Sequence, residues 1–125
     1  MFSHVMIGTN DLEKAKTFYD ATLGALGAKP GMMNGDRVVY MHGGNLLLVT
    51  KPINGEPACG ANGGTIGFAA SSPEAADAWH AAGLAAGGTA IENPPGIRDG
   101  GFGKLYLAYL RDPCGNKVCT MHRMG

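Results

Sequence analysis

The spacing of apolar residues predicts a short strand followed by an amphipathic helix near the start of the chain. Residues 2–7 form an apolar run that ends at a glycine, which is typical of a strand. Asn10 then stands where a helix N-cap is expected, with Glu13 at capping-box spacing. Apolar residues recur every three or four positions from there, until Gly24. These signals predict a helix that begins after Asn10 and stops at Gly24.

The same order recurs 61 residues later in the chain. Residues 65–68 repeat the apolar strand, Ser72 repeats the N-cap, and Pro73 takes the first helical position, which proline favours. Trp79 falls on the position of Phe18, so we expect both aromatic side chains to anchor a helix to the core. The predicted apolar face of the second helix consists of Ala75, Ala78, Trp79 and Ala82, and Gly87-Gly88 ends that helix.

Short apolar runs after each helix predict further strands. They span residues 37–41 and 46–50 in the first half, where a further strand is expected near residues 24–29, and residues 89–92, 105–110 and 117–121 in the second half. Residues 52–64 are rich in proline and glycine and predict a linker, whereas residues 93–103 predict a long loop of the kind that often carries function. We therefore predict one compact α+β domain of two βαβββ modules, residues 1–51 and 65–125.

Composition narrows the classes of function. The chain of 125 residues is 45% apolar, which suits a folded domain, and its 10 basic and 10 acidic residues balance. Zero net charge argues against a nucleic-acid binder and against a polybasic membrane anchor. The first residues carry no basic leader, and the 3 cysteines form no CxxC pair. We expect a cytoplasmic protein that binds neither nucleic acid nor membranes.

Two segments carry a family resemblance. The chain resembles the vicinal-oxygen-chelate superfamily (glyoxalase I, bleomycin-resistance proteins and extradiol dioxygenases) in His4-Val5-x-Ile7-x-x-Asn10-Asp11-Leu12-Glu13 and in Asp112-Pro113-x-Gly115-Asn116-Lys117-Val118. The resemblance covers nearly the whole chain. It implies curved mixed sheets from two βαβββ modules around a cleft, a small-molecule ligand, and a homodimer. It does not fix the reaction, because one fold supports many activities.

The resemblance also implies where a metal would bind. Metal-dependent members take one ligand from the first strand and one from the last strand of each module, usually His and Glu. In this sequence the four positions are His4, Leu48, Thr65 and Cys119. Leucine offers no donor and a threonine hydroxyl is a weak one. We therefore expect no four-ligand metal centre and no cofactor. A divalent metal held by His4 and Cys119 is the alternative, because imidazole and thiolate suit zinc.

Three further inferences concern the ligand. Arg98 carries a permanent charge in the loop of residues 93–103, and a guanidinium binds carboxylates through two hydrogen bonds, which favours a small anionic ligand. By family resemblance, Tyr106 lines the cleft, and His4 and Tyr106 are the catalytic candidates. Thr65, Leu48, Arg98 and Cys119 are the candidate ligand-binding residues. Three of these residues have a structural alternative: a hydrogen-bonded strand histidine for His4, a buried filler for Cys119 and a solvated charge for Arg98.

Three hypotheses about function follow. The first is a glyoxalase-like protein that binds a small, anionic organic compound without the usual metal centre, with catalysis left open. The second is a metal-dependent lyase of the glyoxalase I type with a reorganised site. The third is a metal-free protein that sequesters a drug, as in the bleomycin-resistance branch.

Overall fold

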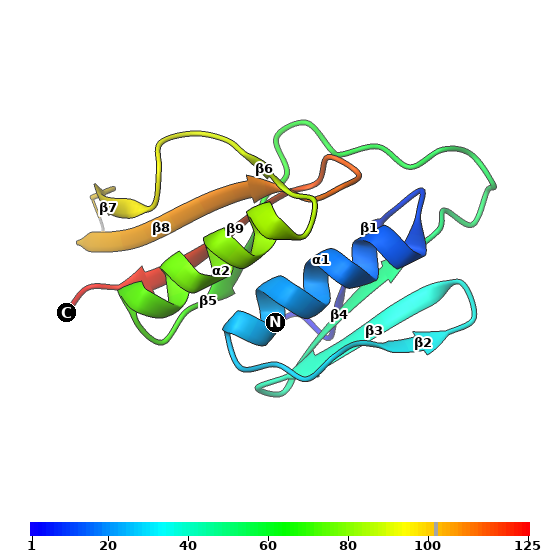
Figure 1. Cartoon of the computed structure of the whole chain (residues 1–125), viewed down its shortest axis with the longest axis horizontal. Coiled ribbons are helices and arrows are strands. Elements are labelled where there is room, and N and C mark those ends of the chain that lie inside the picture. Colours follow the sequence, from blue (N-terminus) through cyan, green and yellow to red (C-terminus); the bar gives the residue numbers. More distant parts are fainter. Residues whose placement is uncertain (102) are drawn as a thin grey trace.

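The computed structural model describes residues 1–101 and 103–125, which form two sheets and two helices (Figure 1). The first half contains β1 (Val5–Gly8), α1 (Leu12–Ala25), β2 (Met32–Asn34), β3 (Arg37–His42) and β4 (Asn45–Thr50). The second half contains β5 (Ile66–Ala69), α2 (Pro73–Ala85), β6 (Thr89–Ala90), β7 (Gly96–Asp99), β8 (Lys104–Arg111) and β9 (Lys117–Arg123). None of the described helices is long and apolar enough to cross a membrane.

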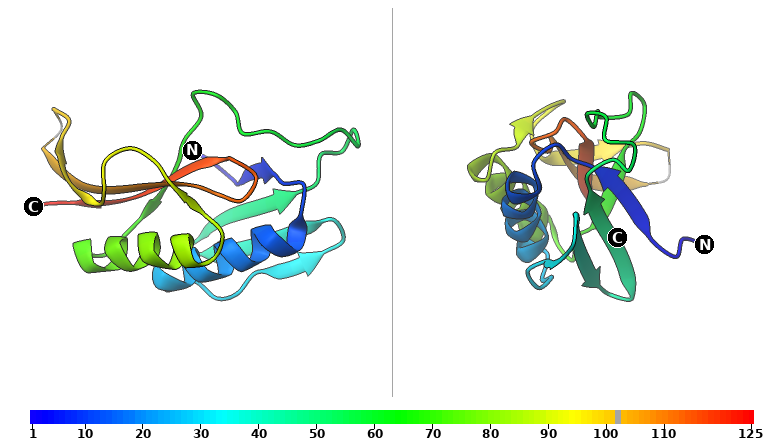
Figure 2. Two further views of the ribbon diagram at one scale, coloured as in Figure 1. Left: turned by 45° about the horizontal axis from the view of Figure 1, so that its top comes forward. Right: turned by 90° about the vertical axis from the view of Figure 1, so that its right-hand side faces the viewer.

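Each half builds one mixed sheet. The first sheet has the order β1-β4-β3-β2, and the second has the order β5-β9-β8-β6, with β7 paired to β8. In each sheet the opening strand runs parallel to the closing strand, β1 to β4 and β5 to β9. Both helices lie on the same side of the sheets and pack against each other (Figure 2). The α+β fold predicted from the sequence is confirmed.

The internal repeat is visible in the element boundaries. Strand β5 begins 61 residues after β1, and α2 begins 61 residues after α1. Phe18 and Trp79, which the repeat aligns, both have 0% exposed surface in the core. The core lies between the helix pair and the inner faces of the two sheets, and it includes Val38, Val49, Leu110 and Val118.

The predicted apolar face of α2 is correct at Trp79, but its alanines are each one position too early in the sequence. The buried residues are Ala76, Trp79 and Gly83, rather than Ala75, Ala78 and Ala82. At Gly83 the two helices approach closely, because a Cβ atom there would lie 3.0 Å from Thr22 Cγ2 of α1. A run of alanines gives little contrast between helix faces, so the sequence did not reveal the face that α1 selects.

Three other local predictions need correction. The N-cap of α1 is Asp11, whose side chain accepts a hydrogen bond from Lys14 N, rather than Asn10. Asn10 instead exchanges two hydrogen bonds with the backbone of Ala58. Strand β2 lies at residues 32–34, whereas the βαβββ pattern placed it near residues 24–29. Strand β7 forms inside the predicted loop of residues 93–103, in which residue 102 lies outside the described residues. The Ser72 N-cap of α2 is confirmed.

A buried carboxylate ties the two halves together. Asp112 has 4% exposed surface and accepts a hydrogen bond from Tyr19 of α1 at 2.6 Å. The same carboxylate accepts hydrogen bonds from the backbone N–H groups of Cys114 and Asn116. The Asn116 side chain donates to Asp112 and to the carbonyl oxygen of Gly8 in β1. Burial and the neighbouring charge of Asp112 raise the pKa of the Tyr19 phenol well above its ordinary value.

We predict that Asp112→Ala lowers the free energy of unfolding by about 3 kcal/mol or more, because several buried donors lose their acceptor. Urea denaturation monitored by circular dichroism measures the change. Asp36→Ala is the matched control, since Asp36 is exposed, and its effect is expected within about 0.5 kcal/mol. Equal effects of the two substitutions would show that Asp112 does not hold the halves together.

Candidate functional site

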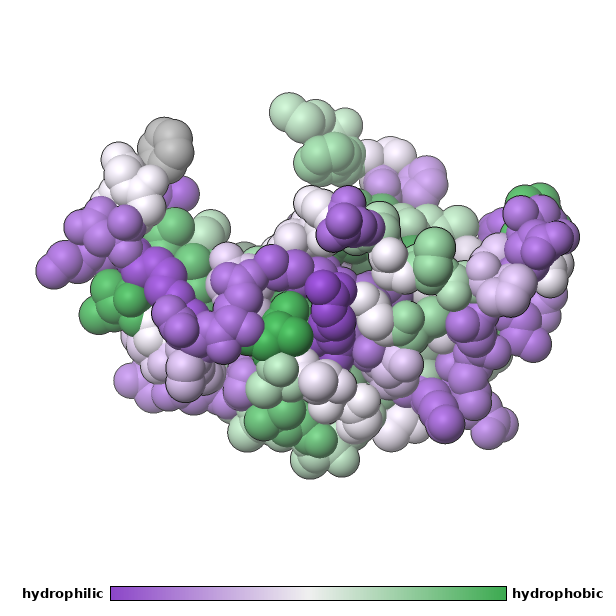
Figure 3. All heavy atoms as spheres, turned by 90° about the horizontal axis from the view of Figure 1, so that it is seen from above, coloured by the Kyte–Doolittle hydropathy of each residue, from purple (hydrophilic) through white to green (hydrophobic). Residues whose placement is uncertain are grey.

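Each sheet has one face turned away from the helices, which we call its open face. Residues alternate between the faces of a strand, and the core residues Leu47, Val49 and Val118 mark the helix side. Their neighbours Leu48 and Cys119 therefore lie on the open faces. Seen from above, the outline on the side away from the helices is hollowed between the end drawn at the left and an apolar projection near the middle (Figure 3).

A cleft of about 760 Å³ lies where the two halves meet. Its walls come from residues 2–5, the C-terminal end of α1, the β3–β4 hairpin and residues 65–69 in and before β5. Most of the lining is apolar, with Leu46, Ile66 and Phe68 among its side chains. A volume of this size suits a small organic ligand.

Of the six predicted site residues, His4 and Thr65 line this cleft. They come from different halves of the chain, each directly before the opening strand of its sheet. Both are exposed, and His4 Nδ1 lies 2.8 Å from the hydroxyl oxygen of Ser3. This contact leaves the other ring nitrogen of His4 available for a ligand.

Leu48 and Cys119 occupy equivalent places on the two open faces. Leu48 of β4 lies opposite Met6 and Val39, so its surroundings are apolar. Cys119 of β9 lies opposite Gly67 and Tyr109. The Cys119 side chain is buried, and this burial raises the pKa of its thiol to about 11. At neutral pH the group is therefore a thiol rather than a thiolate.

The guanidinium of Arg98 is used within the protein. It donates hydrogen bonds to the carbonyl oxygens of Asn93, Pro94, Gly96 and Leu107 at distances of 2.9–3.4 Å. These contacts fix the segment before β7 and attach it to β8. Arg98 does not line the cleft. Recognition of an anion by Arg98 would have to compete with these carbonyl groups.

Tyr106 lies on the helix side of β8, whereas Tyr109 lies on the open face. The Tyr106 hydroxyl donates to the carboxylate of Asp77 in α2 at 2.7 Å, and this hydrogen bond raises the pKa of its phenol. Tyr109 faces Cys119 in register, and the ammonium group of Lys117 lies 5.1 Å from its ring centre. The tyrosine nearest to Cys119 is therefore Tyr109, which sequence reasoning did not select.

His42 also lines the cleft, although it is not among the site residues predicted from the sequence. It ends β3 and lines the cleft together with Asn45, the first residue of β4. Its ring lies beside Gly27, where a Cβ atom would come within 3.7 Å of His42 Cε1. The signal in the sequence is weak, since a histidine beside two glycines is typical of many hairpins.

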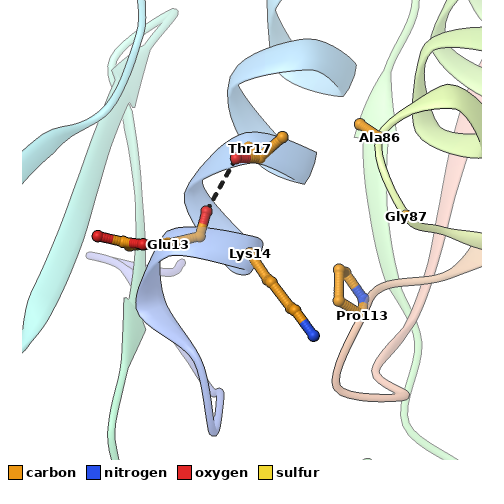
Figure 4. Close-up of a pocket in the computed structure, with 6 residues that line it drawn as sticks. All are labelled: Glu13, Lys14, Thr17, Ala86, Gly87 and Pro113. Atoms are coloured by element: carbon orange, nitrogen blue, oxygen red, sulfur yellow. Dashed lines mark hydrogen bonds between the residues drawn. The ribbon is translucent and has the colours of Figure 1, made fainter.

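A second, smaller hollow lies on the helix side of the molecule. It encloses about 500 Å³ between the first turns of α1, the end of α2 and Pro113 (Figure 4). Lys14 points toward Pro113, Glu13 points away from it, and the Thr17 hydroxyl donates to the Glu13 carbonyl. None of the predicted site residues lines this hollow. The cleft between the halves is therefore the better candidate.

Comparison with known protein families shows which superfamily the chain belongs to. A family model described as the glyoxalase/bleomycin resistance protein/dioxygenase superfamily matches residues 1–120. The chain belongs to this superfamily. This glyoxalase-superfamily chain is similar to a solved glyoxalase/bleomycin resistance protein from Albidiferax ferrireducens T118. The two share 62% identity over 98% of this chain and 99% of the other, with a TM-score of 0.96.

More distant solved structures share the fold. A glyoxalase/bleomycin resistance protein/dioxygenase family enzyme from Burkholderia phytofirmans PsJN is 19% identical over 98% of each chain, with a TM-score of 0.74. A lactoylglutathione lyase from Agrobacterium tumefaciens is 24% identical over 97% of this chain and 92% of the other, with a TM-score of 0.66. No functionally curated protein matches this chain.

The residues at the superfamily's metal positions do not fit a divalent metal. In this superfamily member they supply one imidazole, one hydroxyl, one buried thiol and a leucine. No group of three or more His, Cys, Asp or Glu side chains that could hold a metal occurs among the described residues. Stable chelation of a divalent ion needs several fixed donors. We therefore derive no reaction step through a metal.

We predict that the purified protein retains well below one equivalent of metal after incubation with zinc, nickel, manganese or iron(II) and desalting. The reason is that His4 belongs to no group of three or more His, Cys, Asp or Glu side chains that could hold a metal among the described residues. Plasma mass spectrometry measures the content, and Leu48→Glu with Thr65→His, which restore two family ligand types, form the matched positive control. Stoichiometric metal in the unaltered protein would support the lyase hypothesis instead.

Proposed function

We propose that the protein binds a small organic molecule in the cleft between its two halves, without a four-ligand metal centre. The observation that carries this proposal is the cleft of about 760 Å³, into which His4 from one half and Thr65 from the other both face. A mostly apolar wall with a few hydrogen-bonding groups is typical of ligand sites. His4 is the candidate proton-transfer group because its second ring nitrogen is free to face a ligand.

The anionic nature of the ligand, which the sequence suggested, rested on Arg98. Its guanidinium already donates to four backbone carbonyl groups. A catalytic role for Tyr106 also loses support, because its hydroxyl donates a hydrogen bond to Asp77 on the helix side of the sheet. The proposal therefore relies on the cleft residues and not on these two side chains.

We further propose that the protein is a homodimer in a reducing compartment such as the cytoplasm. The open face of the first sheet carries a row of apolar side chains, one on each strand, from Met6 through Leu48 and Val39 to Met32. Met32 and Met41 on this sheet are 63% and 66% exposed. A second copy would cover this apolar surface. All three cysteines are free, as a reducing compartment requires.

We predict a dimer mass at tens of micromolar protein by size-exclusion chromatography with light scattering. Met41→Glu places a charge on the apolar open face and is expected to shift the protein toward monomer. Ile53→Glu is the control, since Ile53 is fully exposed in the linker. A monomer mass for the unaltered protein would contradict the dimer.

We predict that simple aromatic probes bind in the cleft, and we name 4-methylphenol and 4-methylbenzoate for the test. Titrations followed by ¹H–¹⁵N NMR should shift the backbone signals of residues 3–5 and 65–69 for at least one probe. Thr65→Phe fills the cleft and should weaken binding about fivefold or more. Thr89→Phe, at an exposed strand position outside the cleft, should leave the affinity unchanged. Shifts for neither probe, or shifts elsewhere in the molecule, would refute the proposed function.

A further inference from the structure

We infer that the cleft selects an uncharged molecule that has an apolar body and a hydrogen-bond donor directed at His42. This inference rests on the proposed function, because it names the ligand class for the same cleft. An uncharged ligand suits the described cleft wall, which has no Asp, Glu, Lys or Arg, better than the anionic ligand suggested by the sequence.

The described residues that line the cleft include no Asp, Glu, Lys or Arg. Tyr40 is a lining residue, but its hydroxyl donates to the Asp20 carboxylate at 2.8 Å. Burial and this hydrogen bond raise the pKa of Tyr40, so its phenol stays neutral. A charged ligand would lose water on entry without gaining an opposite charge, which is unfavourable. The wall thus discriminates against ions of either sign.

The C-terminal end of α1 adds a penalty for anions in particular. Leu23, Leu26 and Ala28, at and just beyond this end, line the cleft. The last turn of α1 contains no basic residue. A helix carries partial negative charge at its C-terminal carbonyl groups, and this charge repels an anion nearby. The same end attracts the positive end of an O–H or N–H bond.

His42 is the residue that would determine which ligands the cleft prefers. It lines the cleft, and its ring makes no hydrogen bond to the rest of the described chain. A neutral imidazole has one acceptor nitrogen, so it can accept a hydrogen bond from a ligand hydroxyl or amide N–H. The side chain is held against Gly27 beyond the end of α1. A donor at His42 would therefore also lie beside the negative end of the helix.

The test compares four probes of matched shape: 4-methylphenol, 4-methylanisole, 4-methylbenzoate and 4-methylbenzylammonium. Dissociation constants come from NMR titrations of the protein at pH 8, read from the signals of cleft residues. We expect 4-methylphenol to bind about tenfold more tightly than either ion. We expect 4-methylanisole, which lacks the donor, to bind about threefold more weakly than 4-methylphenol.

Two substitutions separate the contributions. His42→Leu should remove the advantage of 4-methylphenol over 4-methylanisole, whereas His42→Asn, which keeps an acceptor, should retain part of it. Leu46→Lys places a cation in the cleft wall and should make 4-methylbenzoate the tightest of the four. Circular dichroism of each variant tests that it is folded, which we expect because both side chains lie near the surface.

The outcomes distinguish this inference from the proposed function. If 4-methylbenzoate or 4-methylbenzylammonium binds most tightly in the cleft of the unaltered protein, the neutral ligand class is overturned. The proposed function stays in place in that case. An unchanged preference for 4-methylphenol in His42→Leu would remove His42 from the inference. Failure of all four probes to shift cleft signals would refute the proposed function itself.

Discussion

The carboxylate of Asp112 is the contact on which the rest of the structure depends. It accepts hydrogen bonds from Tyr19 of α1 and from the turn that joins β8 to β9. Through Asn116 it is also connected to the carbonyl of Gly8 at the end of β1. The first half of the chain is thus attached to the last hairpin of the second. Because the cleft lies between the halves, its shape depends on this attachment, although Asp112 is not part of the cleft.

The sequence predicted the fold well where local signals and the repeat agreed. Strand, cap and helix recur at one offset, and the aligned Phe18 and Trp79 are both fully buried. It failed where a partner distant in the chain decides the outcome. Asn10 and Asp11 are both good N-caps, and Asn10 is diverted by Ala58, which lies 48 positions away. Strand β7 forms in a glycine-rich segment because β8 pairs with it.

The candidate site was predictable only in part, for the same reason. Strand alternation places Leu48 and Cys119 on open faces, as the family positions imply, yet only the folded chain shows that His4 and Thr65 share a cleft. Arg98 looked free in the sequence because its acceptors are backbone carbonyl groups, most of them on neighbouring residues, and their direction depends on how that segment folds. His42 gave only a weak signal, since its place in the cleft depends on where α1 ends.

Loss of the metal ligands changes the physical basis of recognition in this chain. A chelating site selects its ligand by charge, because a divalent ion attracts anionic oxygen atoms. Here the central row of the first open face runs from Met6 to Met32 through Leu48 and Val39, none of which attracts an anion. The cleft beside it has a charge-free described lining and the negative end of a helix. In such surroundings the desolvation of an ion outweighs any contact it gains. Selectivity then rests on the fit of an apolar body and on one hydrogen bond, which together favour a neutral ligand.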